Sequence, residues 1–267
     1  MIRLAVRASA VDAERVLAAM LELAPGGFEQ VDGDGFVEFA LYGAPGELPA
    51  LTEGEAEVAG VTVSVRGEEV ADDWADRWRG FHRPVLIGQR LWVRPPWEAE
   101  RAGALDLVID PGQAFGTGTH PTTRGCLELL LGLSPERSFA DLGCGSGVLA
   151  IAAAKLGFAP VVAVDGERAA VEATLANAGV NGVSLDRVER LDLRRDPAPP
   201  AAVVAANLVR PLLLELVGRI DPPPEDLILS GLLDHEADEV AAAFSPLAER
   251  RRVSRGGWST VLLGRPA

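Results

Sequence analysis

The most informative stretch of this sequence is Asp141-Leu142-Gly143-Cys144-Gly145-Ser146-Gly147. An apolar run, Ser138 to Leu142, reads as a buried strand, and Gly147 to Leu156 has the pattern of a helix. Glycines let the backbone come close to a ligand, and the first turn of a helix presents unpaired N–H groups to it. The stretch therefore predicts a strand, a ligand-binding bend and a helix, as in nucleotide-binding α/β folds.

The spacing of these glycines distinguishes two kinds of cofactor. Enzymes that bind NAD use G-x-G-x-x-G to hold a pyrophosphate at the helix N-terminus. Here the spacing is G-x-G-x-G, and Asp141 lies two positions before Gly143. A carboxylate repels a pyrophosphate but attracts an ammonium group such as that of a methionine moiety. We therefore predict S-adenosylmethionine as the cofactor, with Asp141, Gly143 and Gly145 in contact with it.

Two polar residues follow later strand candidates. Asp165 ends the strand candidate Val161 to Asp165, 22 positions after Gly143, where a carboxylate can accept hydrogen bonds from both ribose hydroxyls. Asn207 follows the strand candidate Ala202 to Ala206, and an asparagine offers a donor and an acceptor to an incoming amine and to the cofactor. The carboxyl ends of parallel strands form the ligand-binding edge of such sheets. Asn207 is therefore the predicted catalytic residue.

Strands and helices alternate through the C-terminal two-thirds of the chain. The other strand candidates are Leu91 to Val93, Leu105 to Ile109, Arg187 to Leu191, Leu227 to Ser230, Glu249 to Ser254 and Ser259 to Leu263. The other helix candidates are Thr122 to Leu131, Arg168 to Ala178, Pro211 to Ile220 and His235 to Phe244. Such alternation predicts a parallel sheet with helices on both faces. Arg255-Gly256-Gly257 is too short for a parallel crossover, so the last strand should be antiparallel, which is typical of the seven-stranded, Rossmann-like methyltransferase sheet.

Residues 1–66 read as a separate, small α+β unit. Its strand candidates are Ile2 to Arg7, Phe28 to Val31, Phe36 to Tyr42 and Val61 to Arg66, with a helix over Val11 to Leu23 and a weak one within Pro45 to Gly54. This order predicts a ferredoxin-like sandwich. Residues 67–80 mix acidic and aromatic side chains and predict a linker helix, which leaves residues 81–267 as the cofactor-binding domain.

Composition argues against several classes of protein. The 267 residues are 48% hydrophobic and 24% charged, with a net charge of −14 and a pI near 4.7. Nucleic-acid affinity depends on contacts with phosphates, so this acidic chain is a poor candidate for DNA or RNA and suits a basic protein partner. No uncharged apolar run reaches the roughly 18 residues of a membrane span. The only two cysteines, Cys126 and Cys144, suit a soluble protein of the reducing cytoplasm.

A long glycine- and threonine-rich segment ends at the start of the helix candidate Thr122 to Leu131. It reads Asp110-Pro111-Gly112-Gln113-Ala114-Phe115-Gly116-Thr117-Gly118-Thr119-His120-Pro121-Thr122-Thr123. Its hydroxyls and free N–H groups suit the carboxylate of methionine, and such a loop can also fold over a bound cofactor. With the glycine stretch, Asp165 and Asn207, this segment closely resembles the bacterial methyltransferases of ribosomal protein L-eleven (L11). The resemblance covers residues 70–267 well and residues 1–66 in layout only.

The resemblance implies a set of contacts and a substrate. The implied cofactor contacts come from Thr123, Gly143, Asp165 and Asn207. The implied reaction is methyl transfer to lysine ε-amines and to the N-terminal α-amine of L11 in the large ribosomal subunit, with residues 1–66 recognising that protein. This chain departs from the family pattern at Gly166-Glu167 and at Leu208-Val209-Arg210. A methyltransferase acting on another protein or on a small amine therefore stays an alternative.

The expected chemistry is an in-line displacement by a neutral amine, for which proximity and alignment supply most of the acceleration. A lysine must first lose its proton, and desolvation in a pocket favours that loss. No dedicated general base is evident; His120 is a candidate, although a loop-anchoring role suits it better. No His/Cys cluster has metal-ligand spacing, so we predict no metal. Two rival functions are a nicotinamide-dependent oxidoreductase, which the glycine spacing disfavours, and a non-catalytic module that retains the cofactor.

Overall fold

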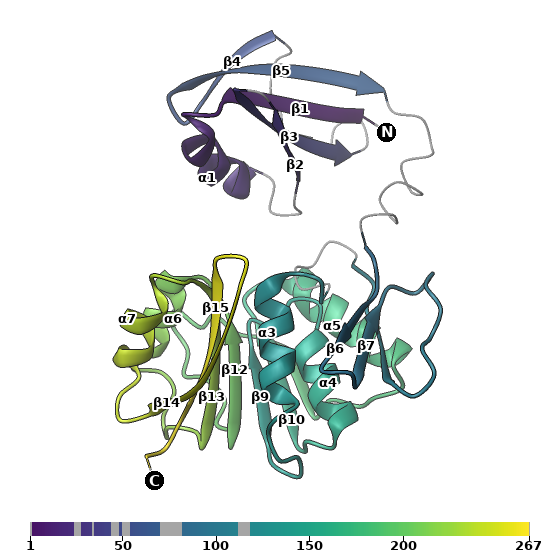
Figure 1. Ribbon diagram of the computed structural model, residues 1–267, viewed down its shortest axis with the longest axis vertical. Coiled ribbons are helices and arrows are strands. Elements are labelled where there is room, and N and C mark those ends of the chain that lie inside the picture. The colour runs from purple at the N-terminus through teal and green to yellow at the C-terminus, as the bar shows by residue number, and fades with distance from the viewer. Residues whose placement is uncertain are drawn as a thin grey trace. The chain divides into compact units, whose positions relative to one another are not determined.

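Two units, Met1–Phe81 and His82–Ala267, make up the chain in the computed structural model (Figure 1). The structure describes residues 2–23, 28–33, 35–43, 48–49, 54–69, 82–111 and 118–266. Most of the predicted linker helix over residues 67–80 lies outside these ranges. Residues 67–69 continue a strand instead, because Glu68 and Glu69 pair with Arg3 and Ile2 of the first strand.

The second unit is built on a seven-stranded sheet. In spatial order its strands are β11 (Arg187–Arg190), β10 (Val161–Asp165), β9 (Phe139–Leu142), β12 (Val203–Asn207), β13 (Asp226–Leu233), β15 (Trp258–Gly264) and β14 (Ala248–Arg255). The first five strands are parallel to one another, and β15 is antiparallel to both of its neighbours, β13 and β14. The sheet thus has the seven strands and the antiparallel last strand that the sequence predicts.

Helices cover both faces of this sheet (Figure 1). The helices α3 (Pro121–Leu130), α4 (Val148–Leu156) and α5 (Arg168–Val180) lie on one face, and α6 (Arg210–Leu216) and α7 (Ala237–Ala243) lie on the other. Successive residues of a strand point to opposite faces. In β9, Phe139 accordingly joins the core cluster on the side of α3 and α4, whereas Ala140 and Leu142 join the cluster on the side of α6 and α7.

A separate three-stranded sheet precedes α3. It consists of β6 (Val85–Ile87), β7 (Leu91–Arg94) and β8 (Leu105–Val108), with β7 and β8 parallel. The alternation of strands and helices implied that Leu105 to Ile109 belongs to the large parallel sheet, which is wrong. Periodicity reports that a segment is extended and half-buried, but it does not identify the neighbouring strand. Among the described strands, β8 pairs with β7 only and forms an edge of the small sheet.

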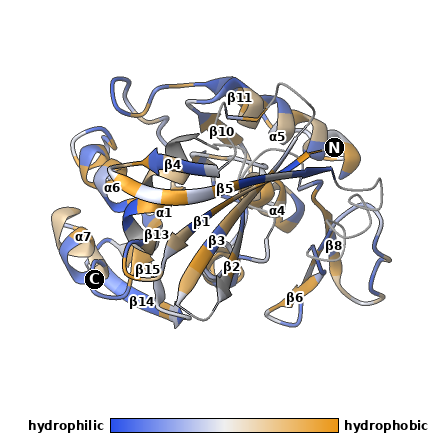
Figure 2. Ribbon diagram, turned by 90° about the horizontal axis from the view of Figure 1, so that it is seen from above, coloured by the Kyte–Doolittle hydropathy of each residue, from blue (hydrophilic) through white to orange (hydrophobic). Residues whose placement is uncertain are grey.

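The first unit contains a five-stranded antiparallel sheet and one described helix. Its elements are β1 (Ile2–Ser9), α1 (Ala13–Leu23), β2 (Glu29–Gly33), β3 (Phe36–Gly43), β4 (Gly54–Val58) and β5 (Val61–Glu69), in the strand order β2-β3-β1-β5-β4. Buried and exposed residues alternate along β5, which carries both hydrophobic and hydrophilic colours in Figure 2. The expected helix within Pro45 to Gly54 falls largely outside the described residues, and Gly54 itself begins β4.

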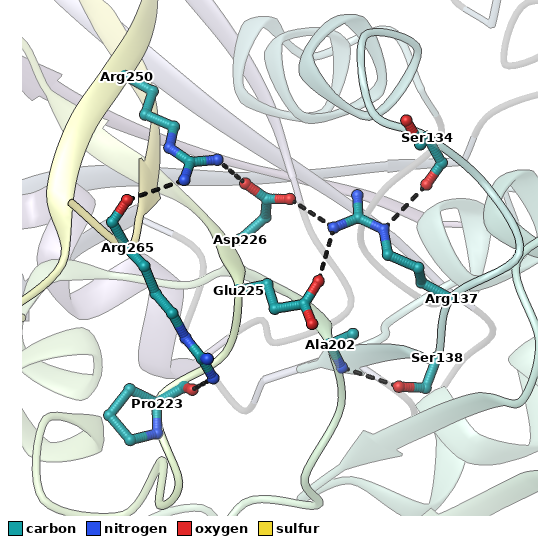
Figure 3. Close-up of polar contacts among 9 residues, drawn as sticks. All are labelled: Ser134, Arg137, Ser138, Ala202, Pro223, Glu225, Asp226, Arg250 and Arg265. Atoms are coloured by element: carbon teal, nitrogen blue, oxygen red, sulfur yellow. Dashed lines mark hydrogen bonds and ion pairs between the residues drawn. The ribbon is translucent and has the colours of Figure 1, made fainter. Parts of the chain in front are cut away.

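A buried carboxylate connects three segments at the amino-terminal ends of the strands of the large sheet (Figure 3). Asp226, at the start of β13, is 3% exposed and accepts hydrogen bonds from Arg137 at 2.8 Å and from Arg250 at 2.9 Å. Arg137 also donates to Glu225 at 3.1 Å. These contacts join the segment before β9, the start of β13 and the strand β14.

In the described part of the chain, no helix is long and apolar enough to cross a membrane.

Candidate functional site

Three predicted site residues lie together at the carboxyl ends of neighbouring strands of the large sheet. Leu142 at the end of β9 pairs with Val164 of β10 on one side and with Ala206 of β12 on the other. Gly143, Asp165 and Asn207 are the next residues along these three strands. The parallel register therefore brings them to one edge, which is where ligands bind in open α/β sheets.

The glycine bend requires its glycines. Gly143, Gly145 and Gly147 have φ values of +78°, +52° and +82°, which L-residues rarely adopt. A Cβ atom at Gly143 would also lie 2.3 Å from Cδ2 of Leu208, and one at Gly147 would lie 2.8 Å from Cγ2 of Thr174. The positive φ values and this close packing therefore require glycine at Gly143 and Gly147, and α4 begins immediately after the bend.

Asp165 is held by two main-chain amides. Its Oδ2 accepts a hydrogen bond from Gly145 N at 3.0 Å, and its Oδ1 accepts one from Glu167 N at 3.0 Å. The residue is partly exposed at the end of β10. Each carboxylate oxygen can accept more than one hydrogen bond, so this carboxylate retains acceptor capacity for a ligand hydroxyl.

Asn207 and Thr123 lie side by side, although 84 positions separate them. The side-chain amide of Asn207 donates to Oγ1 of Thr123 at 3.4 Å. Thr123 is 1% exposed in the first turn of α3, whereas Asn207 is partly exposed at the end of β12. The main chain after Asn207 is fixed as well, because Leu208 N donates to Ser230 O at 3.0 Å and a Cβ at Gly231 would lie 2.3 Å from Leu208 O.

Asp141 lies deeper than its expected place beside a cofactor ammonium. The residue is 1% exposed, and its Oδ2 accepts a hydrogen bond from Ala150 N in the first turn of α4 at 3.1 Å. Its buried Oδ1 has no hydrogen-bond partner among the described residues. Burial, with a smaller contribution from the charge of Asp165, raises the pKa of Asp141 to about 7. One oxygen thus caps α4, and contact with an ammonium stays a prediction.

His120 anchors the start of α3. It is the N-cap residue, its Nδ1 lies 2.7 Å from Oγ1 of Thr122, and its ring packs edge-on against Trp258 with centroids 5.1 Å apart. Burial lowers the pKa of His120, because it disfavours the charged form of the ring. The preceding residues 112–117 of the predicted loop lie outside the described residues. The geometry supports the loop-anchoring role rather than that of a general base.

Sequence reasoning missed the polar side chains that α5 directs at the bend. Thr174 donates to Gly145 O at 3.0 Å, and Asn177 donates to Ser146 O at 2.9 Å. Both side chains are buried, with exposures of 0% and 2%. Polar residues three positions apart on one face of a predicted helix were the available signal.

Among the described residues, no three His, Cys, Asp or Glu side chains gather in a way that could hold a metal ion.

Comparison with known proteins identifies the family. The family model for "Ribosomal protein L11 methyltransferase (PrmA)" matches residues 47–265. This chain belongs to the ribosomal protein L11 methyltransferase family. Relatives named ribosomal protein L11 methyltransferase include that of Pectobacterium atrosepticum, 41% identical over 234 residues that cover 81% of this chain and 78% of the relative. The Aliivibrio fischeri relative is 44% identical over 238 residues, with 82% and 79% coverage.

A solved structure agrees with the L11 methyltransferase assignment. The ribosomal protein L11 methylase from Lactobacillus delbrueckii subsp. bulgaricus aligns with a TM-score of 0.62 and 26% sequence identity, covering 70% of this chain and 100% of that one. Every predicted site residue, from Thr123 to Asn207, lies inside the range that the L11 methyltransferase family model matches. The resemblance noted from the sequence is confirmed, as is an α/β methyltransferase fold with a mixed sheet.

Proposed function

We propose that this chain is an S-adenosylmethionine-dependent protein N-methyltransferase that modifies lysine and N-terminal amines of ribosomal protein L11. The observation that carries the proposal is the meeting of the glycine bend, Asp165 and Asn207 at one sheet edge, in a chain of the L11 methyltransferase family. The relatives of the same name support the same substrate.

The chemistry of the donor set fits this cofactor. Gly143 and Gly145 both have positive φ and are partly exposed, which suits the close approach of a nucleoside to the main chain. Asp165 can accept hydrogen bonds from ribose hydroxyls, and Thr123 and Asn207 can bind the amino-acid end. No phosphate-binding arginine or lysine is needed for a ligand of this kind.

S-adenosylmethionine supplies, when bound, a methyl group on a positively charged sulfur. For transfer, the residues of this chain must hold a neutral amine in line with that methyl group. We assign this task to Asn207, whose amide oxygen can accept a hydrogen bond from the amine while the lone pair of the amine stays free. An ammonium that leaves water loses its proton more readily, because desolvation disfavours the charged form. We therefore expect the ammonium to give up its proton to water before transfer, and we assign no side chain the role of general base.

We assign substrate recognition to the first unit. Residues 1–81 contain 16 acidic and 6 basic side chains, so this unit carries most of the net charge of −14. An acidic surface attracts a basic protein and speeds its association. We also interpret the unit as ferredoxin-like, because the part β2-β3-β1-β5 of its sheet follows the strand order of that fold, with β4 added at one edge.

The decisive experiment combines the purified full chain with purified L11 and methyl-labelled cofactor, followed by mass spectrometry of the modified sites. We expect label on lysine ε-amines and on the N-terminal α-amine of L11. Label on other proteins of a cell extract but not on L11 would instead favour the alternative substrate. Calorimetric binding of NAD but not of S-adenosylhomocysteine would contradict the proposal altogether.

A further inference from the structure

Three polar residues form a line on one face of α5 and its C-cap. Thr174, Asn177 and Asn181 follow one another at spacings of three and four residues, which places them on the same side of a helix. Thr174 and Asn177 are buried, and Asn181 is partly exposed. Polar side chains in such a position need hydrogen-bond partners, and all three have them.

Two of these side chains bind main chain at the end of β8 and just after it. The Asn181 amide accepts from Val108 N at 2.9 Å and donates to Val108 O at 2.6 Å. The Asn177 amide accepts from Asp110 N at 3.0 Å and lies 3.5 Å from Asp110 O, to which it donates. Each asparagine therefore pairs with both polar groups of one residue, as a neighbouring strand does.

The spacing of a helix explains why this pairing is possible. Four residues of an α-helix rise about 6.0 Å, and two residues of a strand advance about 6.6 Å. Alternate residues of a strand direct their N–H and C=O groups to the same side. Asparagines four apart on α5 thus match residues two apart in the chain, Val108 and Asp110. The helix supplies side-chain amides in place of a strand at the edge of the small sheet.

Asn177 differs from Asn181 in one respect. Its Nδ2 also donates to Ser146 O in the glycine bend at 2.9 Å. One buried amide therefore joins the bend to Asp110, the first residue of the segment that leads to α3 and Thr123. Asn181 binds Val108 and the main chain of α5 itself, at Asn177 O, and no hydrogen bond from it to the bend is present in the described part of the chain.

We propose that Asn177 is a positioning residue for the cofactor site, which fixes the glycine bend against the main chain of Asp110. This inference rests on the proposed function, since both connected segments are assigned to the cofactor. Loss of the amide frees the glycine bend and the main chain of Asp110 to move relative to each other, so the cofactor must order them when it binds. Cofactor affinity then falls, whereas the methyl-transfer step in the loaded enzyme keeps its rate.

The test compares Asn177→Ala with Asn181→Ala in the full chain. Both variants remove an amide that pairs with main chain near β8, so both should lower the unfolding temperature. We expect the Kd for S-adenosylhomocysteine and the KM for the methyl donor to rise about tenfold or more in Asn177→Ala and to stay within about threefold in Asn181→Ala. The kcat at saturating cofactor should stay within about threefold in both variants.

A second variant covers the case in which Asn177→Ala does not fold. Asn177→Asp keeps the side-chain size and the acceptor for Asp110 N but loses the donor to Ser146 O and to Asp110 O, and we expect the same rise in Kd. Equal Kd values in the Asn177 and Asn181 variants would overturn the positioning role while the wild type still binds and methylates. A wild-type chain that binds no S-adenosylhomocysteine would overturn the proposed function itself, and this inference with it.

Discussion

The main-chain amide of Gly145 donates a hydrogen bond to Oδ2 of Asp165 across 3.0 Å. The bend after β9 and the end of β10 therefore hold each other in place. Asp165 contributes to the site in two ways, since it supports the bend and retains capacity to accept hydrogen bonds from a ligand.

Replacement of Asp165 by alanine should weaken binding of S-adenosylhomocysteine by about 1–3 kcal/mol, the scale of a lost hydrogen bond to a charged group. Isothermal titration calorimetry measures this change. Glu189→Ala is the control, because Glu189 pairs in register with Val164 on the neighbouring strand and lacks contact with the bend among the described hydrogen bonds. An unchanged affinity in Asp165→Ala would remove Asp165 from the ribose-binding role.

Replacement of Asn207 by alanine should lower the kcat of L11 methylation by about 10- to 100-fold, which corresponds to one lost hydrogen bond that orients the amine. Initial rates at saturating cofactor and L11 provide the measurement. Thr123→Ser is a suitable control, since it keeps the hydroxyl that accepts from the Asn207 amide. A normal kcat in Asn207→Ala would mean that another group orients the amine.

Asp141 should make the stability of the wild type depend on pH. Burial raises its pKa from the ordinary 3.8 to about 7, so the folded protein keeps a proton that the unfolded chain has already lost. This contribution to stability is complete below pH 3.8 and is lost as the pH rises through about 7. Asp141→Asn cannot titrate, so its free energy of unfolding relative to wild type should increase from about pH 5 to about pH 8. Urea unfolding at each pH tests this; a constant difference would contradict it.

Asp226→Asn should destabilise the fold without changing the site. Loss of a buried carboxylate between two arginines costs about 3–5 kcal/mol when the pair is fully buried, and less here because the Arg250 side chain is 48% exposed. We expect about 2–3 kcal/mol by urea unfolding, with an unchanged Kd for S-adenosylhomocysteine. Glu225→Gln, at a side chain that is 51% exposed, should cost under about 1 kcal/mol.

Removal of residues 1–81 should separate cofactor binding from substrate recognition. The second unit has its own two core clusters, so it should fold and bind S-adenosylhomocysteine with wild-type affinity. Methylation of L11 should fall below detection. If the truncated chain methylates L11 at the normal rate, the first unit is not the recognition domain.

The sequence was sufficient for most of the large sheet and its helices. Helical and strand periodicities were strong there, because each element buries a full face or stripe, as the alternation along β9 illustrates. The strand β4 was missed because Gly54-Glu55-Ala56-Glu57 is polar, with little apolar patterning. The placement of β8 was wrong because the apolar pattern of β8 does not identify β7, its described neighbour, as the strand with which it pairs.

The site was predicted in its residue types rather than in its supporting contacts. Gly143, Asp165 and Asn207 were accessible to reasoning because strand ends and glycine spacing mark them. The Asn177 contact with Asp110 spans 67 positions, and no local pattern encodes such a distance. The capping of α4 by Asp141 was missed because the same carboxylate suited a ligand role equally well.

The pairing between α5 and the chain after β8 has a consequence for sequence variation. The hydrogen bonds of Asn177 and Asn181 with Asp110 and Val108 all go to main-chain atoms of those two residues. Side chains at positions 108 and 110 can therefore change to any residue except proline, which lacks the N–H donor, without loss of these bonds. The two asparagines lack that freedom, and a single inserted residue between them would turn one amide about 100° away from its partner.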